Sequence, residues 1–263
     1  MDSNTLRDFN EMTALERVSI ELTNQCGKAC SFCYNHSLPE GSTDWQPSEV
    51  IDFVRDCAKN GVKAVSFGGG EPLQYPGLFD LLAELHGTLF RSITTNGLLL
   101  SREMLQRLCA VSPDKIHVSI HFPERRQEVT RVIEQVHALS NAGIQSGINF
   151  LVDRNKLDVG KQAAQQVRDS GIGNERIVYL PMRGQATPTP EQVADVAGNQ
   201  PFQSMSCLSN CARSPRFCSI GWDKSIARCS YTSSRVKLPT LTYEGIISTL
   251  PTLDLTFCGG LDD

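Results

Sequence analysis

Two hydrophobic periodicities alternate along residues 17–198, and this alternation limits the fold more than any other feature of the chain. Six short apolar segments have the composition of β-strands and lie at 17–23, 63–68, 91–97, 115–122, 145–153 and 176–182. After each of them, apolar residues recur with the helical period, at 47–61, 77–87, 101–111, 127–143, 161–171 and 189–198. Strands joined through helices pair in parallel by right-handed crossovers, so the pattern predicts an α/β fold with a parallel sheet.

Six strand–helix units are fewer than the eight that close a barrel, so we expect an open, partial (β/α)6 TIM barrel. Helix-end signals support these assignments. Gly61 follows the first helix as a C′ glycine, Ser101 is placed to N-cap the third, and Thr189 begins a capping box. The pattern changes after residue 184, which predicts a barrel at 1–184 and a linker with a cysteine-rich extension at 185–263.

Charge and hydropathy exclude several classes of protein. The net charge of −4 and the pI of about 5.8 provide no general basic surface for nucleic acid or an anionic membrane. The polar, acidic start lacks the features of a secretory signal, and no run approaches the roughly 18 apolar residues of a membrane span. We therefore expect a cytoplasmic protein. Disulfides are uncommon in that compartment, so the ten cysteines indicate metal binding or redox chemistry.

Unusual residues gather at the ends of the predicted strands. Three cysteines follow the first strand, GGGEP (68–72) follows the second, and TTNG (94–97) ends the third. Ser119 and His121 end the fourth strand, and Asn149 lies in the fifth. Since the C-terminal strand ends of a barrel share one rim, where chemistry collects, we expect these residues to face a single site.

The spacing of Cys26, Cys30 and Cys33 leaves four chemistries to compare. A disulfide conflicts with the expected compartment and leaves an odd thiol. A zinc site requires His36 as a fourth ligand, and a C-x2-C redox pair leaves Cys26 unused. A cubane iron–sulfur cluster normally takes four thiolates, so three would leave one iron open to an outside ligand, as a catalytic site requires. The spacing favours the iron–sulfur cluster, with zinc as the alternative.

Two motifs carry a family resemblance. Residues 26–33 reproduce C-x3-C-x-Φ-C, where Φ is the aromatic Phe32, and Gly69, Gly70 and Glu71 reproduce a GGE motif after the second strand. Over roughly residues 17–183 the chain resembles the radical S-adenosylmethionine (radical SAM) family. The resemblance implies that the three cysteines bind a [4Fe–4S] cluster whose open iron binds SAM. It further implies reductive cleavage of SAM to a 5′-deoxyadenosyl radical, which removes a hydrogen atom from the substrate.

The resemblance also implies roles for the other residues of the rim. Phe32 and the backbone of Tyr34 should lie beside the adenine of SAM. Gly69, Gly70 and Glu71 should receive the methionine ammonium; the alternative from the residues alone is a tight glycine turn with a helix-capping carboxylate. Contacts with the methionine carboxylate and the ribose hydroxyls are implied for Thr95, Asn96, Ser119, His121 and Asn149.

A second group of cysteines lies in the tail, at Cys207, Cys211, Cys218, Cys229 and Cys258. Residues 217–231 have the pattern of a short hairpin, with WDKS (222–225) at the turn. This stretch resembles the SPASM or twitch extension of radical SAM enzymes, which binds an auxiliary [4Fe–4S] cluster, but Lys224 replaces the turn glycine of that motif. The resemblance implies one auxiliary cluster on Cys211, Cys229, Cys258 and either Cys207 or Cys218. The fifth thiol is then structural or donates a hydrogen atom, and zinc or free thiols are the alternatives.

Together these features predict a radical SAM oxidoreductase whose auxiliary cluster assists oxidation or crosslinking. The expected substrate is a peptide or an amino-acid-derived natural-product precursor. The alternatives are dehydrogenation of a small amino sugar or cyclitol, and activation of a glycyl-radical enzyme. A non-catalytic metal scaffold would not need the GGEP loop. The expected partners are an external one-electron reductant of flavodoxin or ferredoxin type and, because only 16 residues precede the first strand, a separate peptide-recognition protein.

Overall fold

The strands form one continuous sheet in the computed structural model, which describes residues 15–204, 208 and 216–255. The strand order is β10-β9-β8-β1-β2-β3-β4-β5-β6-β7. The six central strands are β1 (Arg17–Thr23), β2 (Ala64–Gly69), β3 (Phe90–Thr95), β4 (Lys115–Ile120), β5 (Ser146–Val152) and β6 (Ile177–Pro181). All neighbouring pairs among them are parallel, which confirms the predicted partial (β/α)6 barrel.

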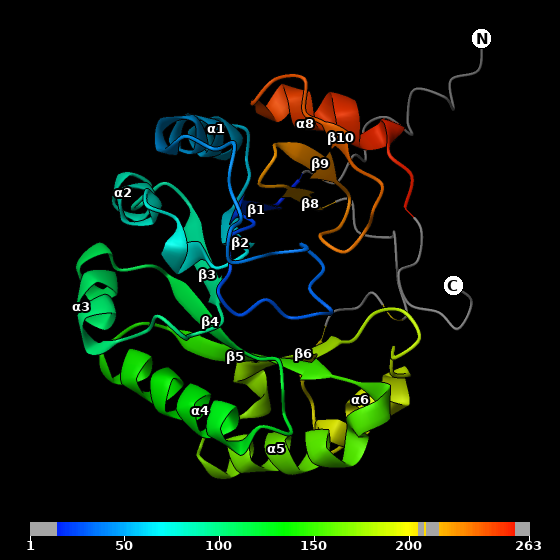
Figure 1. Cartoon of the computed structure of the whole chain (residues 1–263). Helices are drawn as coiled ribbons and strands as arrows, with labels where there is room; N and C mark the ends of the chain where they lie inside the picture. Colours follow the sequence, from blue (N-terminus) through cyan, green and yellow to red (C-terminus); the bar gives the residue numbers. More distant parts are fainter. Residues whose placement is uncertain (1–14, 205–207, 209–215, 256–263) are drawn as a thin grey trace.

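Helices cover the outer side of the strand arc (Figure 1). They are α1 (Pro47–Lys59), α2 (Leu78–Glu84), α3 (Arg102–Val111), α4 (Arg126–Asn141), α5 (Leu157–Asp169) and α6 (Pro190–Val196). Short 3₁₀ turns lie at η1 (Pro72–Gln74), η2 (Arg154–Lys156) and η3 (Asn174–Arg176). Apolar side chains from the strands and helices form one buried core. None of the helices in the described ranges combines the length and apolar character needed to cross a membrane.

The predicted helix ends are confirmed. Met104 N donates a hydrogen bond to Ser101 Oγ (3.2 Å) at the start of α3. Thr189 and Gln192 form a reciprocal capping box at α6, with bonds of 2.8 and 3.3 Å. Gly61 has a φ of 95° after α1, a left-handed conformation that glycine adopts without steric cost. Local sequence therefore sets where these helices begin and end.

Small hydroxyl side chains occupy one level of the barrel interior. Ser219, Ser19, Ser66 and Ser92 are register partners across four adjacent strands. A closed barrel of this type fills its interior with bulky branched side chains. Serine at this level leaves space instead, and Ser19 and Ser66 line the cavity described below.

The tail extends the same sheet beyond β1. β8 (Phe217–Ile220) pairs in parallel with β1, β9 (Ser225–Ala227) returns antiparallel to β8, and β10 (Val236–Lys237) pairs with β9. The predicted hairpin is therefore confirmed. At the opposite edge β7 (Gln203–Ser204) pairs with β6, and α8 (Tyr243–Thr249) and η4 (Leu250–Thr252) follow β10. The boundary after residue 184 stays a prediction, because strands on both of its sides belong to one sheet.

Lys224 stands at the hairpin turn with a φ of 63°, the left-handed conformation in which glycine is favoured. Its Nζ lies 2.8 Å from Glu49 Oε2 on α1 and 5.5 Å from the centre of the Trp45 ring. Trp45 Nε1 in turn donates to Gly221 O (3.0 Å) in the same turn. These contacts hold the turn against the barrel and explain how lysine is accommodated at a glycine position.

Candidate active site

The predicted rim residues surround one cavity of about 500 Å³, a size typical of small-molecule sites. The cysteine loop (residues 24–46, between β1 and α1), the ends of β2 to β6, and Ser230 and Tyr231 of the tail all contribute to its lining. The predicted site residues among those that line it are Cys26, Cys30, Phe32, Cys33, Tyr34, Gly69, Gly70, Thr95, Asn96, Ser119, His121 and Asn149.

Cys26, Cys30 and Cys33, the loop cysteines, are free thiols on the cysteine loop, the first buried and the others half-buried. Backbone bonds shape the loop around them: Cys26 N donates to Leu38 O (2.8 Å), and Cys33 N donates to Cys30 O (3.1 Å). In the described part of the chain, no three Cys, His, Asp or Glu side chains converge on a position for a single metal ion.

Polar groups around the loop cysteines affect their chemistry. Burial raises the pKa of the Cys30 thiol to about 11, and the nearby Lys28 ammonium opposes the rise. Because metals bind thiolates, iron binding at Cys30 must displace a proton. Asn96 Nδ2 lies 3.4 Å from Cys26 Sγ and donates to it, while Asn96 Oδ1 accepts from Leu98 N (2.8 Å). The sequence did not predict this contact between Asn96 and Cys26. Hydrogen bonds to ligand sulfurs tune the reduction potential of iron–sulfur clusters, so the contact would matter if Cys26 binds a cluster.

The GGE glycines pack against the start of the cysteine loop. Gly69 has a φ of 104°, and a Cβ there would lie 2.6 Å from Thr23 O. A Cβ on Gly70 would meet the carbonyl group of Gln25, with its carbon at 2.8 Å. Gly70 N also donates to Thr23 O (2.6 Å). These glycines are required because two backbone segments meet there, whether or not a ligand also approaches.

The Glu71 carboxylate is 1% exposed and satisfied inside the protein. Oε1 accepts from Leu73 N (3.1 Å) and Thr95 Oγ1 (2.7 Å), and Oε2 accepts from Asn96 N (2.8 Å). Burial raises its pKa, and these hydrogen bonds oppose the rise. Glu71 does not line the cavity. Glu71 thus caps η1 and supports Thr95 and Asn96, the role that the residues alone suggested, and its contact with the methionine ammonium stays a prediction.

The cavity is also lined by polar residues in or directly after β4 and β5 and by Phe32 of the cysteine loop: Ser119, His121 and Asn149 are the polar residues. Ser119 and Asn149 are register partners on β4 and β5. The Phe32 ring centre lies 6.3 Å from that of His121. Burial lowers the pKa of His121 to about 4, so its ring is neutral at pH 7, with one nitrogen donating and the other accepting. These residues present polar groups beside an aromatic ring.

Lys28 is a site residue that sequence reasoning missed. Its Nζ lies 2.9 Å from Glu128 Oε1 and 3.0 Å from His121 Nδ1, and the side chains of Lys28 and Glu128 are each 8% exposed. Its position between two cysteines was visible in the sequence. No spacing rule connects it with Glu128, which is 100 residues away.

Tail residues form another wall of the cavity. The rings of Tyr34 and Tyr231 lie 4.9 Å apart, and the Arg183 guanidinium stands 4.2 Å from the centre of the Tyr231 ring. Tyr231 N donates to Cys229 Sγ (3.5 Å). The tail thus contacts the cysteine loop one residue after Cys33, a juxtaposition that no local sequence pattern predicted.

A buried ion pair connects the barrel to the tail. Glu21 on β1 is 2% exposed, and its Oε1 accepts from Arg235 Nη2 (3.1 Å) and Ser219 Oγ (3.0 Å). Burial raises the pKa of Glu21, and Arg235 opposes the rise. The three groups come from β1, β8 and the segment after β9, so they tie the extension to the first strand.

Two of the five tail cysteines, Cys218 and Cys229, lie within the described residues, and their environments differ. Cys207, Cys211 and Cys258 lie outside the described residues. Cys229 is half-buried near the cavity wall. Cys218 is fully buried in the apolar core near Cys57, and burial raises the pKa of its thiol. Of the two candidates for the fourth ligand, Cys218 therefore has the environment of a structural residue.

His117, to which the sequence analysis gave no role, lines the lower part of the cavity. Its Nε2 is buried and has no hydrogen-bond partner within the described residues. Gly147 on β5 makes room for the ring, because a Cβ there would lie 2.8 Å from His117 Cδ2. Burial lowers the pKa of His117 to about 3, so the imidazole is neutral. A mid-strand histidine gives no sequence signal of which side it faces.

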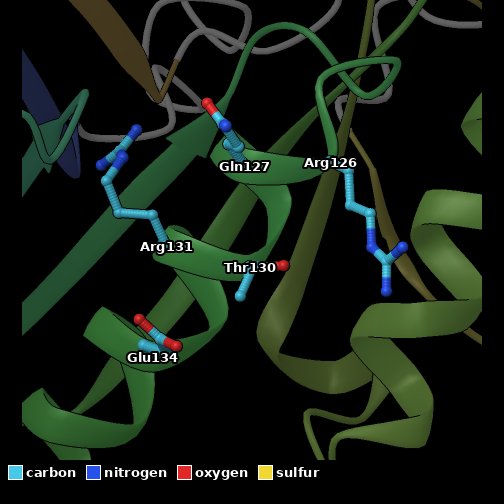
Figure 2. A pocket seen from close by; sticks show the side chains of 5 residues that line it. All are labelled: Arg126, Gln127, Thr130, Arg131 and Glu134. Atoms are coloured by element: carbon cyan, nitrogen blue, oxygen red, sulfur yellow. The ribbon is translucent and has the colours of Figure 1, made fainter.

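A second hollow, on the surface of α4, lacks the features of a site. It is lined by Arg126, Gln127, Thr130, Arg131 and Glu134. Figure 2 shows these side chains pointing to different sides of the helix rather than toward a common point. The cavity at the barrel rim is therefore the candidate active site.

A protein-family model described as the radical SAM superfamily matches residues 20–184. The matched segment runs from within β1 to just past β6 and contains the loop cysteines and the GGE motif. It contains neither the hairpin nor the tail cysteines.

Curated proteins match parts of the chain. A probable GTP 3′,8-cyclase of Methanosarcina mazei is 32% identical over 141 residues, which cover 49% of this chain and 42% of that protein. The PqqA peptide cyclase of Granulibacter bethesdensis is 23% identical over 238 residues, which cover 80% of this chain and 64% of that protein. The chain thus spans less than half the length of the first of these relatives.

Solved structures share the fold. Streptococcus suis SuiB bound to its precursor peptide SuiA has a TM-score of 0.69 at 13% identity, covering 89% of this chain and 64% of that one. Native anSMEcpe with bound AdoMet and Cp18Cys peptide has a TM-score of 0.65 at 13% identity, covering 89% of this chain and 80% of that one.

Proposed function

Because the chain belongs to the radical SAM superfamily, which uses a [4Fe–4S] cluster and SAM, we propose that Cys26, Cys30 and Cys33 bind that cluster. One observation carries the proposal: the loop cysteines open onto the same cavity as the ends of β2 to β6. The donor set fits the group, because iron–sulfur clusters are held by thiolates and three thiolates leave one iron for SAM. The hydrogen bond from Asn96 to Cys26 suits a sulfur that carries negative charge.

When bound, the cluster and SAM supply a 5′-deoxyadenosyl radical by one-electron reductive cleavage. The side chains around them bind and orient. Phe32 offers an apolar face for the adenine, and Ser119, His121 and Asn149 offer hydrogen bonds to polar groups of SAM. Glu71 acts indirectly, by fixing Thr95 and Asn96. Tyr34 and Tyr231 pack against each other where the cysteine loop and the tail both line the cavity.

For the tail, we propose an auxiliary [4Fe–4S] cluster on Cys207, Cys211, Cys229 and Cys258, with Cys218 as a structural core residue. Two observations support this choice. Cys218 lies in the apolar core, where a cluster would displace packed side chains. Cys229 belongs to the segment whose Tyr231 lines the cavity, so a cluster there would lie on the substrate side. Such a cluster would accept an electron from the substrate and make the reaction a net oxidation or crosslinking.

The substrate that we propose is a peptide or an amino-acid-derived precursor. The match to a PqqA peptide cyclase extends over 80% of this chain and so includes residues beyond 184. Solved structures of the same fold are described with bound peptides. A separate protein would present the peptide, and an external one-electron reductant of flavodoxin or ferredoxin type would reduce the cluster.

A purine nucleotide is the second candidate substrate. The observation that favours it is the 32% identity with a probable GTP 3′,8-cyclase. That match covers 49% of this chain, and the segment that determines the substrate in a radical SAM enzyme need not lie within it. The peptide therefore remains the first candidate.

The test uses the full chain reconstituted anaerobically with iron and sulfide. SAM and a reductant should yield 5′-deoxyadenosine, measured by chromatography, and a variant with all three loop cysteines changed to alanine is the control. Deuterated GTP and deuterated precursor peptides encoded beside the gene are then compared as substrates, by the amount of deuterium that each transfers to 5′-deoxyadenosine. Deuterium in 5′-deoxyadenosine from a peptide supports the first candidate, and deuterium from GTP supports the second. If the wild type forms no 5′-deoxyadenosine, the proposed function is wrong.

A further inference from the structure

Lys28 is buried inside the cysteine loop and joins it to a distant part of the barrel. Its ammonium contacts Glu128 Oε1 at 2.9 Å and His121 Nδ1 at 3.0 Å, and stands 5.4 Å from the centre of the Phe122 ring. The next residue, Ala29, has a φ of 46°, in the left-handed region that non-glycine residues avoid. Such a conformation persists only where surrounding contacts hold it, and the bonds of Lys28 are contacts of that kind.

Glu128 connects Lys28 to the turn after β4. It lies in the first turn of α4, and its Oε1 also accepts from the backbone N–H groups of His121 (2.7 Å) and Phe122 (3.3 Å). One carboxylate oxygen thus binds the ammonium of the cysteine loop and the backbone that carries His121. The Phe32 ring packs 5.4 Å from Phe122, which adds a second contact between the same two segments.

The same network determines which nitrogen of His121 carries the proton. The Lys28 ammonium can only donate, so His121 Nδ1 must accept and a neutral ring carries its proton on Nε2. His121 lines the cavity, so its Nε2–H would be the donor that the ring offers to a ligand oxygen. Without Lys28 the ring would lose both its fixed tautomer and its fixed orientation.

We propose that Lys28 and Glu128 are positioning residues for SAM, which hold the cysteine loop and the His121 ring in one rigid unit. The inference rests on the proposed function, because it takes SAM as the ligand that His121 contacts. Lys28 and Glu128 act on SAM through His121. The pair places cluster ligands and a SAM contact relative to each other.

The main experiment compares Lys28→Met, His121→Ala and the double variant by anaerobic titration of the reconstituted full chain with SAM. Lys28→Met should raise the Kd for SAM about 5- to 10-fold, the effect of one buried hydrogen bond. In the His121→Ala background the same change should add less than about 2-fold, because positioning through His121 makes the two effects non-additive. Equal effects in both backgrounds would contradict the proposal.

A second measurement follows the imidazole directly. Long-range ¹H–¹⁵N spectra of the ¹⁵N-histidine-labelled full chain, recorded before reconstitution, should show His121 protonated on Nε2 with Nδ1 accepting a hydrogen bond. His121→Ala identifies the signal. In Lys28→Met the Nδ1 resonance should move to the position of an unbonded nitrogen, and an unchanged resonance would refute the role of Lys28.

Glu49→Gln is the matched control. Glu49 also stands in the first turn of a helix and also accepts from a lysine, Lys224, at 2.8 Å, but Lys224, unlike Lys28, does not line the cavity. This variant should keep the wild-type Kd for SAM, and a rise equal to that of Lys28→Met would overturn the proposal. If Lys28→Met does not fold, Glu128→Gln takes its place in the SAM titration, because glutamine still accepts from the backbone. Absence of SAM binding in the wild type would instead refute the proposed function, and the ¹⁵N spectra would still test the network.

Discussion

Gly70→Ala tests whether the GGE motif is needed by the fold itself. The added Cβ would meet the Gln25 carbonyl group, lying 2.8 Å from its carbon and 2.9 Å from the carbonyl carbon of Asn24. Ordinary contact begins at 3.4 Å, and both neighbours are backbone, so the cysteine loop itself must move. Overpacking costs roughly 1–3 kcal/mol, and a clash with backbone belongs at the upper end, about 3 kcal/mol. With a urea m-value of about 3 kcal/mol/M, the midpoint should fall by about 1 M.

Urea denaturation of the full chain, followed by circular dichroism, measures this loss. The matched control is Gly68→Ala in the same triplet, because a Cβ on Gly68 meets nothing within 4 Å. That variant should stay within about 0.5 kcal/mol of the wild type, because the new methyl group extends into open space and displaces no neighbour. Iron content after reconstitution should fall in Gly70→Ala, since the displaced loop carries Cys26. Equal midpoints for the two variants would show that the glycines are not required by packing.

Three further predictions concern the cysteines and the hairpin turn. Alanine at any one loop cysteine should abolish 5′-deoxyadenosine formation, and normal turnover in one of these variants would contradict the cluster assignment. Lys224→Gly should be more stable than Lys224→Ala by about 0.5–1 kcal/mol in urea denaturation, because only alanine keeps the strain of the left-handed turn; equal stabilities would exclude that strain. Cys229→Ala should lower the iron content by about four per chain, whereas Cys218→Ala should keep the iron and lose about 1–2 kcal/mol of stability. Equal iron losses would refute that choice of ligands.

Local patterns in the sequence were sufficient to predict the strands and helices of the barrel. The alternation of period-2 and period-3.6 segments predicted six parallel strands, and capping residues such as Ser101 and Thr189 begin helices where expected. These signals work because strand and helix periodicity depend on residues a few positions apart. The hairpin at 217–231 was predicted for the same reason. Its parallel pairing with β1 was not, since no local pattern encodes which edge of a sheet a distant strand joins.

The features of the candidate site also fall into two groups, those that local sequence predicted and those that only the tertiary structure showed. The sequence alone determined the loop cysteines, the GGE turn and the set of polar strand ends, because their spacing is local and the rim of a barrel brings strand ends together. Only the tertiary structure decided that Glu71 is satisfied internally, that Asn96 contacts Cys26, and that Cys218 packs in the core.

Lys28 and Glu128 show most directly why some contacts of the site could not be predicted from the sequence. They are separated by 100 residues, and neither has a spacing or a neighbour that marks it as a partner of the other. A buried charge is stable only when the fold supplies its counter-charge, and that requirement is met by packing rather than by adjacency in the chain. The sequence by itself therefore determined the architecture and the cysteines that we propose as cluster ligands. The tertiary structure decided which side chains hold those residues in place.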